Sequence, residues 1–273
     1  MNTPKTSPKT PSETTVLFVG ATGSIGELAV EQAVKKGFQV RALVRDRGRA
    51  ERLLGTEVEL VVGDLTQPDS LHTAVVGVDA VVLTHGSSTR ESDVRDIDYA
   101  GVANILTAAK ASSEPASETL KIVLMTAVGV TRPGMPYATW KWRGEQLVRA
   151  SVFDYTIVRP GWFDYNDAGQ RQILMRQGDT KRSASPSDGV IGRDEIARVL
   201  VESILSTETS RKTFEIEAIK GPEQQDLSAD FAALQPDSEG SLYGVEDSGI
   251  PELSAEPQKF LDDLSRIQAS KKD

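Results

Sequence analysis

Three glycines at intervals of three residues constrain this chain more than any other feature. They follow the run Val16–Val19, which is apolar throughout and typical of a strand buried on both faces. A side chain at Gly20, Gly23 or Gly26 would block both a sharp strand-to-helix turn and a ligand approaching the backbone. The freed N–H groups and the positive end of a helix dipole favour a pyrophosphate, so the sequence predicts a dinucleotide-binding turn. The expected cofactor contacts in this turn are Gly20, Thr22, Gly23, Ser24, Ile25 and Gly26.

Apolar runs alternate with amphipathic segments along most of the chain. Strands are predicted at residues 16–19, 39–44, 58–62, 79–83, 121–125, 155–158 and 214–218. This alternation predicts the α/β class, with a doubly wound, mostly parallel sheet that carries helices on both faces. Right-handed crossovers give the strand order 3-2-1-4-5-6, with ligands at the carboxyl ends of the strands.

The composition excludes several kinds of site and partner. The chain has 273 residues, a formal net charge of −9, no cysteine and two histidines. Disulfides and thiolate chemistry are therefore excluded, and no metal site is expected. The acidic balance argues against nucleic-acid binding, and no apolar run approaches the length needed to cross a membrane. The expected partner is a small-molecule substrate, and a homo-oligomer stays open.

Composition also divides the chain into three parts. Residues 1–14 are rich in Thr, Pro, Ser and Lys without an apolar core, which predicts a disordered leader and not a signal peptide. We therefore expect a cytoplasmic protein. Residues 15–220 carry the alternating pattern and form the expected dinucleotide-binding domain. Residues 221–273 lose this period, which predicts a small C-terminal extension that packs loosely on the body.

The end of the second strand gives a mixed signal for the adenosine ribose. Arg45 and Asp46 lie about twenty residues past the glycines, where dinucleotide-binding folds contact this ribose. An acidic residue there hydrogen-bonds a free hydroxyl, whereas an arginine pairs with the 2′-phosphate of NADP. Because Arg45 comes first, we favour NADP and keep NAD as the alternative. Arg47 and Arg49 are interpreted as an ordinary solvated helix start.

Further cofactor candidates follow the other strands at the same edge of the sheet. Asp64 and Leu65 end the third strand, where an acidic group can receive the adenine amino group. Small residues after the fourth and sixth strands let a cofactor lie against the backbone. These candidates are Thr84, His85, Gly86, Pro160 and Gly161. His85 is interpreted as a loop contact more than as a catalytic group.

The catalytic candidates follow the fifth strand. Tyr137 and Lys141 are four residues apart, which places them on one face of a helix. A neighbouring cation stabilises a phenolate, so such a tyrosine can exchange a proton with a carbonyl oxygen while lysine holds the nicotinamide ribose. Thr126 ends the strand and is expected to hydrogen-bond the same carbonyl. The same spacing also occurs by chance on helix surfaces, and Pro136 places Tyr137 near the helix start.

Large aromatic residues gather in the same half of the chain. Trp162 and Phe163 follow the carboxyl end of a strand, and we favour them as walls of an apolar substrate pocket. Trp140 and Trp142 are expected to pack the helix against the sheet or against a partner subunit. Arg159, at a strand end, is expected to be paired structurally.

These motifs resemble those of the short-chain dehydrogenases/reductases, specifically the atypical, NmrA-like branch. The matching stretches are Gly20–Gly26, Ala42–Asp46, Gly63–Leu65, Tyr137-x-x-x-Lys141 and Arg159–Gly161, within roughly Val16 to Phe214. The resemblance implies a Rossmann fold with NADP(H) or NAD(H), and it places Arg45 at the 2′-phosphate. Thr126 stands where active reductases usually have serine. In this branch the tyrosine is often absent, and several members act as regulators or dinucleotide sensors.

The leading hypothesis is an NAD(P)H-dependent oxidoreductase of a small or flat carbonyl compound. In it Tyr137 is the acid/base, Lys141 anchors the ribose and tunes the tyrosine, and Thr126 orients the carbonyl. One alternative is a dinucleotide-binding regulator or redox sensor without turnover. Another is a dehydratase, epimerase or auxiliary oxygenation enzyme that uses the same fold and bound cofactor.

Overall fold

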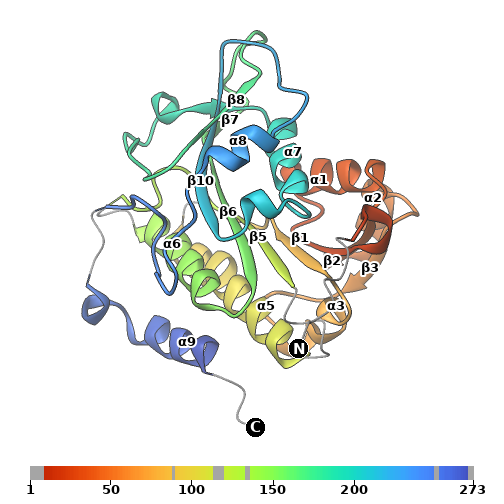
Figure 1. The fold of residues 1–273 in the computed structure, drawn as a ribbon. Helices are drawn as coiled ribbons and strands as arrows, with labels where there is room; N and C mark the ends of the chain where they lie inside the picture. The colour runs from red at the N-terminus through yellow and green to blue at the C-terminus, as the bar shows by residue number, and fades with distance from the viewer. Residues whose placement is uncertain (1–8, 88–89, 113–119, 133–135, 249–251, 270–273) are drawn as a thin grey trace, which may run out of the picture.

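The computed structural model describes residues 9–87, 90–112, 120–132, 136–248 and 252–269, without the side chains of Pro136 and Tyr137. Its centre is an eight-stranded sheet in the order β3-β2-β1-β4-β5-β6-β10-β8 (Figure 1). Its strands are β1 (Thr15–Val19), β2 (Gln39–Val44), β3 (Glu59–Val62), β4 (Ala80–Leu83), β5 (Lys121–Met125), β6 (Asp154–Pro160), β8 (Gln172–Arg176) and β10 (Lys212–Ile219). The predicted α/β fold and the order 3-2-1-4-5-6 are confirmed.

The far edge of the sheet adds to what the sequence predicted. β10 pairs parallel with β6, and β8 pairs antiparallel with β10, so that Glu217 lies opposite Leu174. β8 was not predicted, because Gln172–Arg176 shows no strict alternation and its apolar run, Ile173–Met175, is only three residues long. Two short strands, β7 (Trp162–Phe163) and β9 (Val190–Ile191), make a separate two-stranded sheet.

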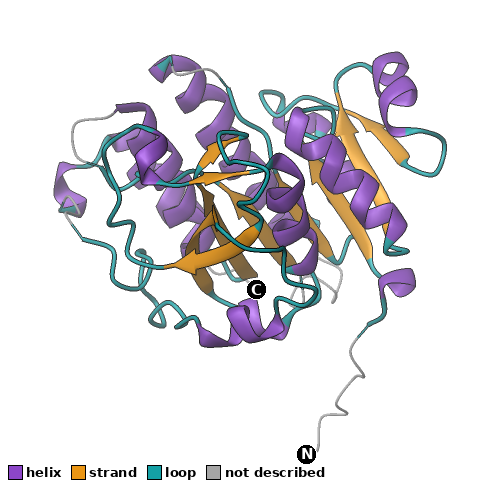
Figure 2. Ribbon diagram, turned by 90° about the horizontal axis from the view of Figure 1, so that it is seen from above, coloured by secondary structure: helices purple, strands orange, loops and turns teal. Residues whose placement is uncertain are grey.

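Helices cover both faces of the sheet, as Figure 2 shows from above. The α-helices are α1 (Ser24–Lys35), α2 (Arg47–Leu54), α3 (His72–Val75), α4 (Glu91–Asp93), α5 (Ala100–Ala111), α6 (Pro136–Ala150), α7 (Arg193–Glu202), α8 (Ser228–Ala233) and α9 (Gln258–Gln268). A π-helical segment, Val94–Tyr99, joins α4 to α5. Short 3-10 helices occupy Pro11–Glu13, Pro68–Ser70, Pro186–Asp188, Thr207–Thr209 and Leu253–Ala255.

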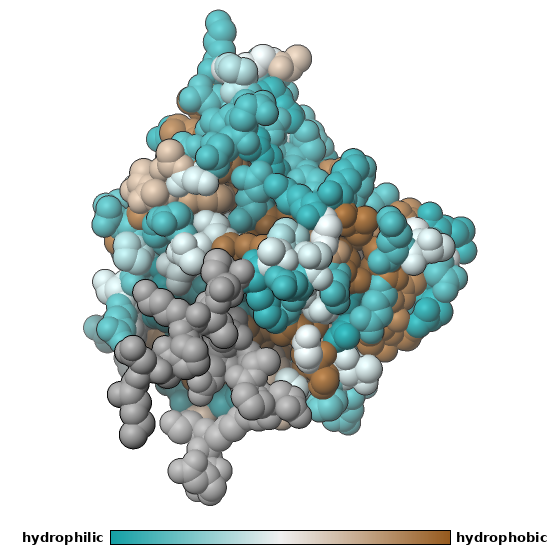
Figure 3. Space-filling view, turned by 45° about the vertical axis from the view of Figure 1, so that its right-hand side comes forward, coloured by the Kyte–Doolittle hydropathy of each residue, from teal (hydrophilic) through white to brown (hydrophobic). Residues whose placement is uncertain are grey.

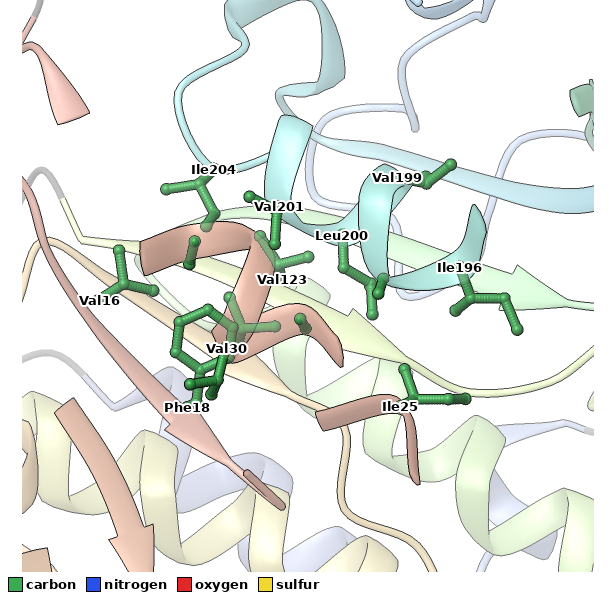
Figure 4. Close-up of a cluster of buried hydrophobic side chains, with 14 of the residues drawn as sticks. Val16, Phe18, Ile25, Val30, Val123, Ile196, Val199, Leu200, Val201 and Ile204 are labelled. Atoms are coloured by element: carbon green, nitrogen blue, oxygen red, sulfur yellow. The ribbon is translucent and has the colours of Figure 1, made fainter. Parts of the chain in front are cut away.

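Two hydrophobic clusters fill the spaces between the sheet and these helices. On one face Phe18 of β1, Val30 of α1 and Leu200 of α7 are buried together (Figure 4). On the other face Tyr155 of β6 and Leu106 of α5 belong to the second cluster. Successive residues of one strand, such as Leu17 and Phe18, belong to opposite clusters, because successive side chains of a strand point to opposite faces of the sheet.

The C-terminal extension is packed closely on the body, so the expectation of loose packing was wrong. Phe231 of α8 is 2% exposed, and its ring lies 6.1 Å from that of Phe214. On the opposite face α9 buries Phe260 in the second cluster. The hydroxyl of Tyr99 donates a hydrogen bond to Asp263 Oδ2 at 2.8 Å, which ties α9 to the π-helical segment.

The described part of the N-terminal segment also differs from a disordered leader. Residues 9–14 include the 3-10 helix Pro11–Glu13. Gln39 Nε2 donates to the carbonyl of Ser12 at 2.8 Å, and Lys9 pairs with Asp79 at 2.5 Å. Residues 1–8 lie outside the described part of the chain.

One face of the molecule is drawn as a space-filling surface in Figure 3. Figure 3 shows hydrophilic residues over much of one face, with hydrophobic residues exposed between them. Within the described ranges, no helix combines the length and the apolar character needed to span a bilayer.

Candidate functional site

A cavity of about 770 Å³ lies at the carboxyl edge of the sheet, where the sequence predicted ligand binding. Its walls come from the ends of strands β1 to β5, from α6 and from β7. The predicted residues that line it are Gly20, Thr22, Gly23, Ser24, Ile25, Arg45, Asp64, Leu65, Thr84, His85, Gly86, Thr126, Lys141 and Phe163. Residues from these seven segments of the chain therefore meet at one cavity.

The first and third glycines of the turn leave no room for side chains. Gly20 has φ of +90°, and a Cβ there would lie 2.6 Å from the backbone nitrogen of His85. A Cβ on Gly26 would overlap the carbonyl group of Gly20 and lie 2.9 Å from Thr84 Oγ1. Gly23 N–H donates to the Gly20 carbonyl at 2.9 Å and precedes the first turn of α1. This cradle presents backbone N–H groups to the cavity and fits a pyrophosphate.

Cations mark the expected adenosine end of the cavity. Arg45 and Arg49 both line it, although Arg49 was interpreted as a solvated helix start. Asp46 caps α2, because its Oδ1 accepts a hydrogen bond from the backbone N–H of Arg49 at 2.9 Å. This bond uses one carboxylate oxygen of Asp46 as the N-terminal cap of α2. The guanidiniums of Arg45 and Arg49 give this end of the cavity positive charge.

Asp64 is held by its own loop. Its Oδ1 accepts hydrogen bonds from the backbone N–H and the hydroxyl of Thr66, both at 2.8 Å. These bonds, with a smaller contribution from the Arg45 charge, keep the pKa of the Asp64 carboxyl below its usual value. Asn104 Nδ2 donates to the carbonyl of the neighbouring Leu65 at 2.7 Å and fixes the same loop.

His85 lies beneath the glycine turn and contacts the π-helical segment. Its Nε2 is 3.1 Å from the carbonyl oxygen of Asp98. Burial lowers the pKa of the imidazole, which favours the neutral ring. Its buried Nδ1 has no hydrogen-bond partner within the described residues. A polar atom left in this state at a cavity wall fits a site that receives a polar ligand.

Lys141 reaches the cavity from α6 and forms an ion pair with Asp98. The Asp98 carboxylate is 5% exposed and also accepts hydrogen bonds from Ser87, from its N–H at 2.9 Å and its hydroxyl at 2.6 Å. Asp98 was missed in the sequence. Its one signal there is an acidic residue among the apolar positions of a helical pattern.

Thr126 is buried in the cavity wall, where its hydroxyl donates a hydrogen bond to Glu145 Oε1 at 2.6 Å. Glu145 is fully buried, and its carboxylate accepts hydrogen bonds from Arg159 at 2.6 and 3.0 Å and from Arg149 at 3.1 Å. Because the Thr126 hydroxyl donates its hydrogen bond to Glu145, its oxygen can only accept a hydrogen bond from a ligand in the cavity. This arrangement differs from the expected donation to a substrate carbonyl.

The predicted structural pairing of Arg159 is confirmed. Its guanidinium is fully buried and bonds Asp247 at 2.7 and 2.8 Å and Glu215 at 3.1 Å, besides Glu145. Burial and the facing carboxylates act in opposite directions on Arg159, and the carboxylates prevail, so its pKa is raised. Asp247 comes from the C-terminal extension, which therefore completes a charge network one step behind Thr126.

The remaining predicted residues lie elsewhere. Tyr137 is in the first turn of α6, and its side chain is outside the described part of the structure. Neither Pro160 nor Gly161 is among the described residues that line the cavity; Gly161 packs instead against Gly189. Trp162, unlike Phe163, is not among the described residues that line the cavity; it is 38% exposed and contacts Tyr165 edge to face.

Two other predictions from the aromatic residues and the composition can be compared with the structure. Trp140 and Trp142 are 6% and 2% exposed, so both are packed inside the protein, and their rings contact Tyr99 of the π-helical segment and Tyr243 of the C-terminal extension. Among the residues that the structure describes, no three His, Cys, Asp or Glu side chains are arranged to hold a metal ion.

Comparison with known proteins identifies the family of this chain. A family model described as NAD(P)H-binding matches residues 20–207, which is more than half of the chain. The chain belongs to the NAD(P)H-binding family. The match begins at the first glycine of the turn and ends beyond α7, so it contains every segment that lines the cavity.

Curated relatives span different functions. Sanguinarine reductase from Eschscholzia californica is 27% identical over 266 residues, with 81% of this chain and 94% of the relative covered. The photosystem II assembly factor Ycf39 from Cyanophora paradoxa is 29% identical over 205 residues. That alignment covers 73% of this chain but only 62% of the relative.

A solved structure supports the fold. A putative NAD-dependent epimerase/dehydratase from Bacillus halodurans matches with a TM-score of 0.64 and 23% identity, covering 81% of this chain and all of that one. At this identity the likeness shows the Rossmann fold alone. The glycine cradle, the cationic end and the orphaned His85 nitrogen then fit a nicotinamide dinucleotide.

Proposed function

We propose that this member of the NAD(P)H-binding family is an NADPH-dependent reductase of a small or flat carbonyl compound. The observation that carries the proposal is Lys141, which lines the cofactor cavity from α6, four residues after Tyr137. A cation at this spacing stabilises the tyrosinate and lowers the tyrosine pKa toward neutrality. It matches the tyrosine–lysine spacing of the short-chain dehydrogenases/reductases, the family that the sequence resembles.

In this proposal each residue has a distinct part in reduction. The cofactor, when bound, supplies a hydride to the carbonyl carbon. Tyr137 would give its hydroxyl proton to the carbonyl oxygen, which together with the hydride yields the alcohol. Lys141 stabilises the resulting tyrosinate and contacts the nicotinamide ribose, while Asp98 holds the ammonium in place. Thr126 presents a hydrogen-bond acceptor to the cofactor or to a substrate hydroxyl.

Two features support the choice of cofactor and substrate. Arg45 and Arg49 line the expected 2′-phosphate end of the cavity, and Asp46 is engaged as a helix cap, which favours NADP over NAD. Phe163 gives the other end an apolar wall suited to a flat compound. The near full-length similarity to sanguinarine reductase agrees with a reductase. A cytoplasmic location and a homo-oligomer remain predictions.

The second candidate is a dinucleotide-binding regulator or redox sensor without turnover. It is favoured by the engagement of two catalytic candidates inside the protein: Thr126 donates to Glu145, and Lys141 is paired with Asp98. Similarity to a photosystem II assembly factor agrees with such a role. In this case the cavity would bind the cofactor, and its occupancy would be the signal.

The substitution Tyr137→Phe separates the two candidates. Oxidation of NADPH is followed with a panel of quinones and aromatic aldehydes and ketones, and NADPH binding is titrated in parallel. Loss of a general acid should lower kcat about 100-fold or more while leaving the dissociation constant of NADPH nearly unchanged. Tyr165→Phe, on an exposed side chain, is the matched control and should keep full activity.

Each outcome has a clear meaning. Turnover that survives Tyr137→Phe would refute the acid/base assignment. A wild-type protein that binds NADPH and reduces no member of the panel would favour the sensor.

A further inference from the structure

Two helices that are far apart in the sequence begin side by side at the cofactor cavity. α1 and α7 pack on the same face of the sheet, where Val30 and Leu200 share a hydrophobic cluster (Figures 1 and 4). Figure 4 shows Ile25 and Ile196, each close to the start of its helix, toward the same end of the pair. The glycine turn therefore has a second helix start as its neighbour.

Arg193, the first residue of α7, touches the first residue of α1. Its Nε donates a hydrogen bond to Ser24 Oγ at 3.1 Å. Its guanidinium lies over the ring of Phe163, 5.4 Å from the ring centre. Ser24 and Phe163 both line the cavity, so this charge stands at the cavity rim beside the turn that fits a pyrophosphate.

Asp164 holds Arg193 in this position. The carboxylate forms an ion pair with the guanidinium and accepts the backbone N–H of Arg193 at 3.1 Å. Asp164 has φ of +59°, a left-handed conformation that costs energy for most residues other than glycine but is tolerated by Asp and Asn. The chain thus adopts an uncommon backbone conformation where this carboxylate meets the arginine.

The Arg193 pair differs from the other arginine pairs near α7. Arg171 contacts Asp194, Glu195 and Glu223, and Arg198 contacts Glu202 and Glu223. Within the described part of the chain, Asp164 is the one carboxylate paired with Arg193, and the two side chains are 49% and 36% exposed. An exposed pair of this kind is weak, so a phosphate can replace Asp164 at little cost.

We propose that Arg193 binds the pyrophosphate of the dinucleotide, which replaces Asp164 as the partner of its guanidinium. The glycine turn supplies backbone N–H donors from α1, and Arg193 adds a charged, planar donor from α7, which suits phosphate oxygens. This assignment rests on dinucleotide binding by the cavity and not on the proposed reduction. It also gives the α7 start a part in cofactor binding that no sequence motif marked.

The test compares dinucleotides by binding titration and so does not depend on turnover. Arg193→Ala should weaken NADPH and NADH alike, by about 10-fold or more, because both carry the same pyrophosphate. Adenosine 2′-phosphate has no pyrophosphate, so its binding should not change. Arg45→Ala should show the reverse pattern, with weaker NADPH and adenosine 2′-phosphate and unchanged NADH.

Three further variants separate phosphate binding from a merely structural role. Arg193→Lys should recover part of the affinity. Asp164→Asn keeps the left-handed backbone but removes the competing charge, so it should bind NADPH as well as or better than wild type. Arg198→Ala, on the same helix, is the matched control and should bind normally once thermal unfolding shows that it is folded.

Two results would overturn the assignment in different ways. Normal NADPH and NADH affinity in Arg193→Ala, or equal losses in Arg193→Ala and Asp164→Asn, would show that the pair is structural. A wild-type protein that binds neither dinucleotide would overturn the cofactor site as a whole. Retained binding with no reductase activity would affect only the proposed function.

Discussion

Replacing Glu215 by glutamine should remove a pH dependence from the stability of this protein. Glu215 lies on β10, and its carboxylate accepts a hydrogen bond from Arg159 at 3.1 Å. Burial raises its pKa from 4.5 to about 7, although the Arg159 charge acts in the opposite direction. Behind the cavity the guanidiniums of Arg149 and Arg159 face the carboxylates of Glu145, Glu215, Asp237 and Asp247.

The sign and size of the effect follow from the two pKa values of Glu215. Between about pH 4.5 and pH 7 the folded protein binds more protons at this residue than the unfolded chain, so stability falls as pH rises. Above this window Glu215 is ionised in both states, and the folded protein bears the full free-energy cost of burying its carboxylate. At 1.36 kcal/mol for each pKa unit, a pKa raised by about 2.5 corresponds to about 3 kcal/mol. Glutamine keeps a hydrogen-bond acceptor for Arg159 and cannot ionise.

Urea unfolding of wild type and Glu215→Gln from about pH 4 to about pH 8 measures this difference. The variant should gain relative stability as pH rises, by about 3 kcal/mol across the window. Glu51→Gln, which removes an exposed carboxylate on α2, is the control and should follow wild type. A difference between Glu215→Gln and wild type that stays constant with pH would refute the reasoning.

Other substitutions test the cradle and the C-terminal extension. Gly26→Ala places a Cβ against the carbonyl of Gly20, so NADPH titration should show binding weakened about 10-fold or more, whereas Gly169→Ala has open space and should bind normally. Asp247→Ala removes two hydrogen bonds from buried Arg159 and should lower the free energy of unfolding by about 3 kcal/mol in urea. Phe260→Ala should cost about 3–5 kcal/mol, and a loss below about 1 kcal/mol would show that α9 is not part of the core.

Much of the fold could be predicted because its signals are local. The apolar run before Gly20 and the glycines after it specify a buried strand and a tight turn within a few residues. The order of six strands then follows from connection rules. β8 escaped prediction because it sits at the sheet edge beyond the parallel strands, and its sequence has no clear period.

The candidate site was predicted where one segment supplies the whole signal. The glycine turn, Arg45 and Lys141 could be identified in this way. Asp98 and Arg193 could not, since their partners Lys141 and Ser24 are 43 and 169 residues away in the chain. An acidic residue in a helix or an arginine at a helix start is ordinary until the fold brings it to a cavity.

The role of Thr126 also could not be predicted from a single segment, because it depends on the direction of one hydrogen bond. Its position at the end of β5 was predictable, but its hydrogen-bond direction depends on Glu145, a helix residue whose charge is held by two buried arginines. The acidic extension contributes Asp247 to that network. From composition alone this extension was predicted to be loosely packed, because the sequence does not distinguish a buried carboxylate that pairs with an arginine from an exposed one.

The most direct test of the account is a titration of NADPH and NADH against wild type and Arg45→Ala. The account predicts that wild type binds NADPH at least about 10-fold more tightly than NADH, because a charge-assisted bond to the 2′-phosphate is worth about 1.5–3 kcal/mol. Arg45→Ala should erase this preference and leave NADH binding unchanged. Equal binding, or a preference for NADH, would contradict the place given to Arg45. Failure of wild type to bind either dinucleotide would contradict the assignment of the cavity itself.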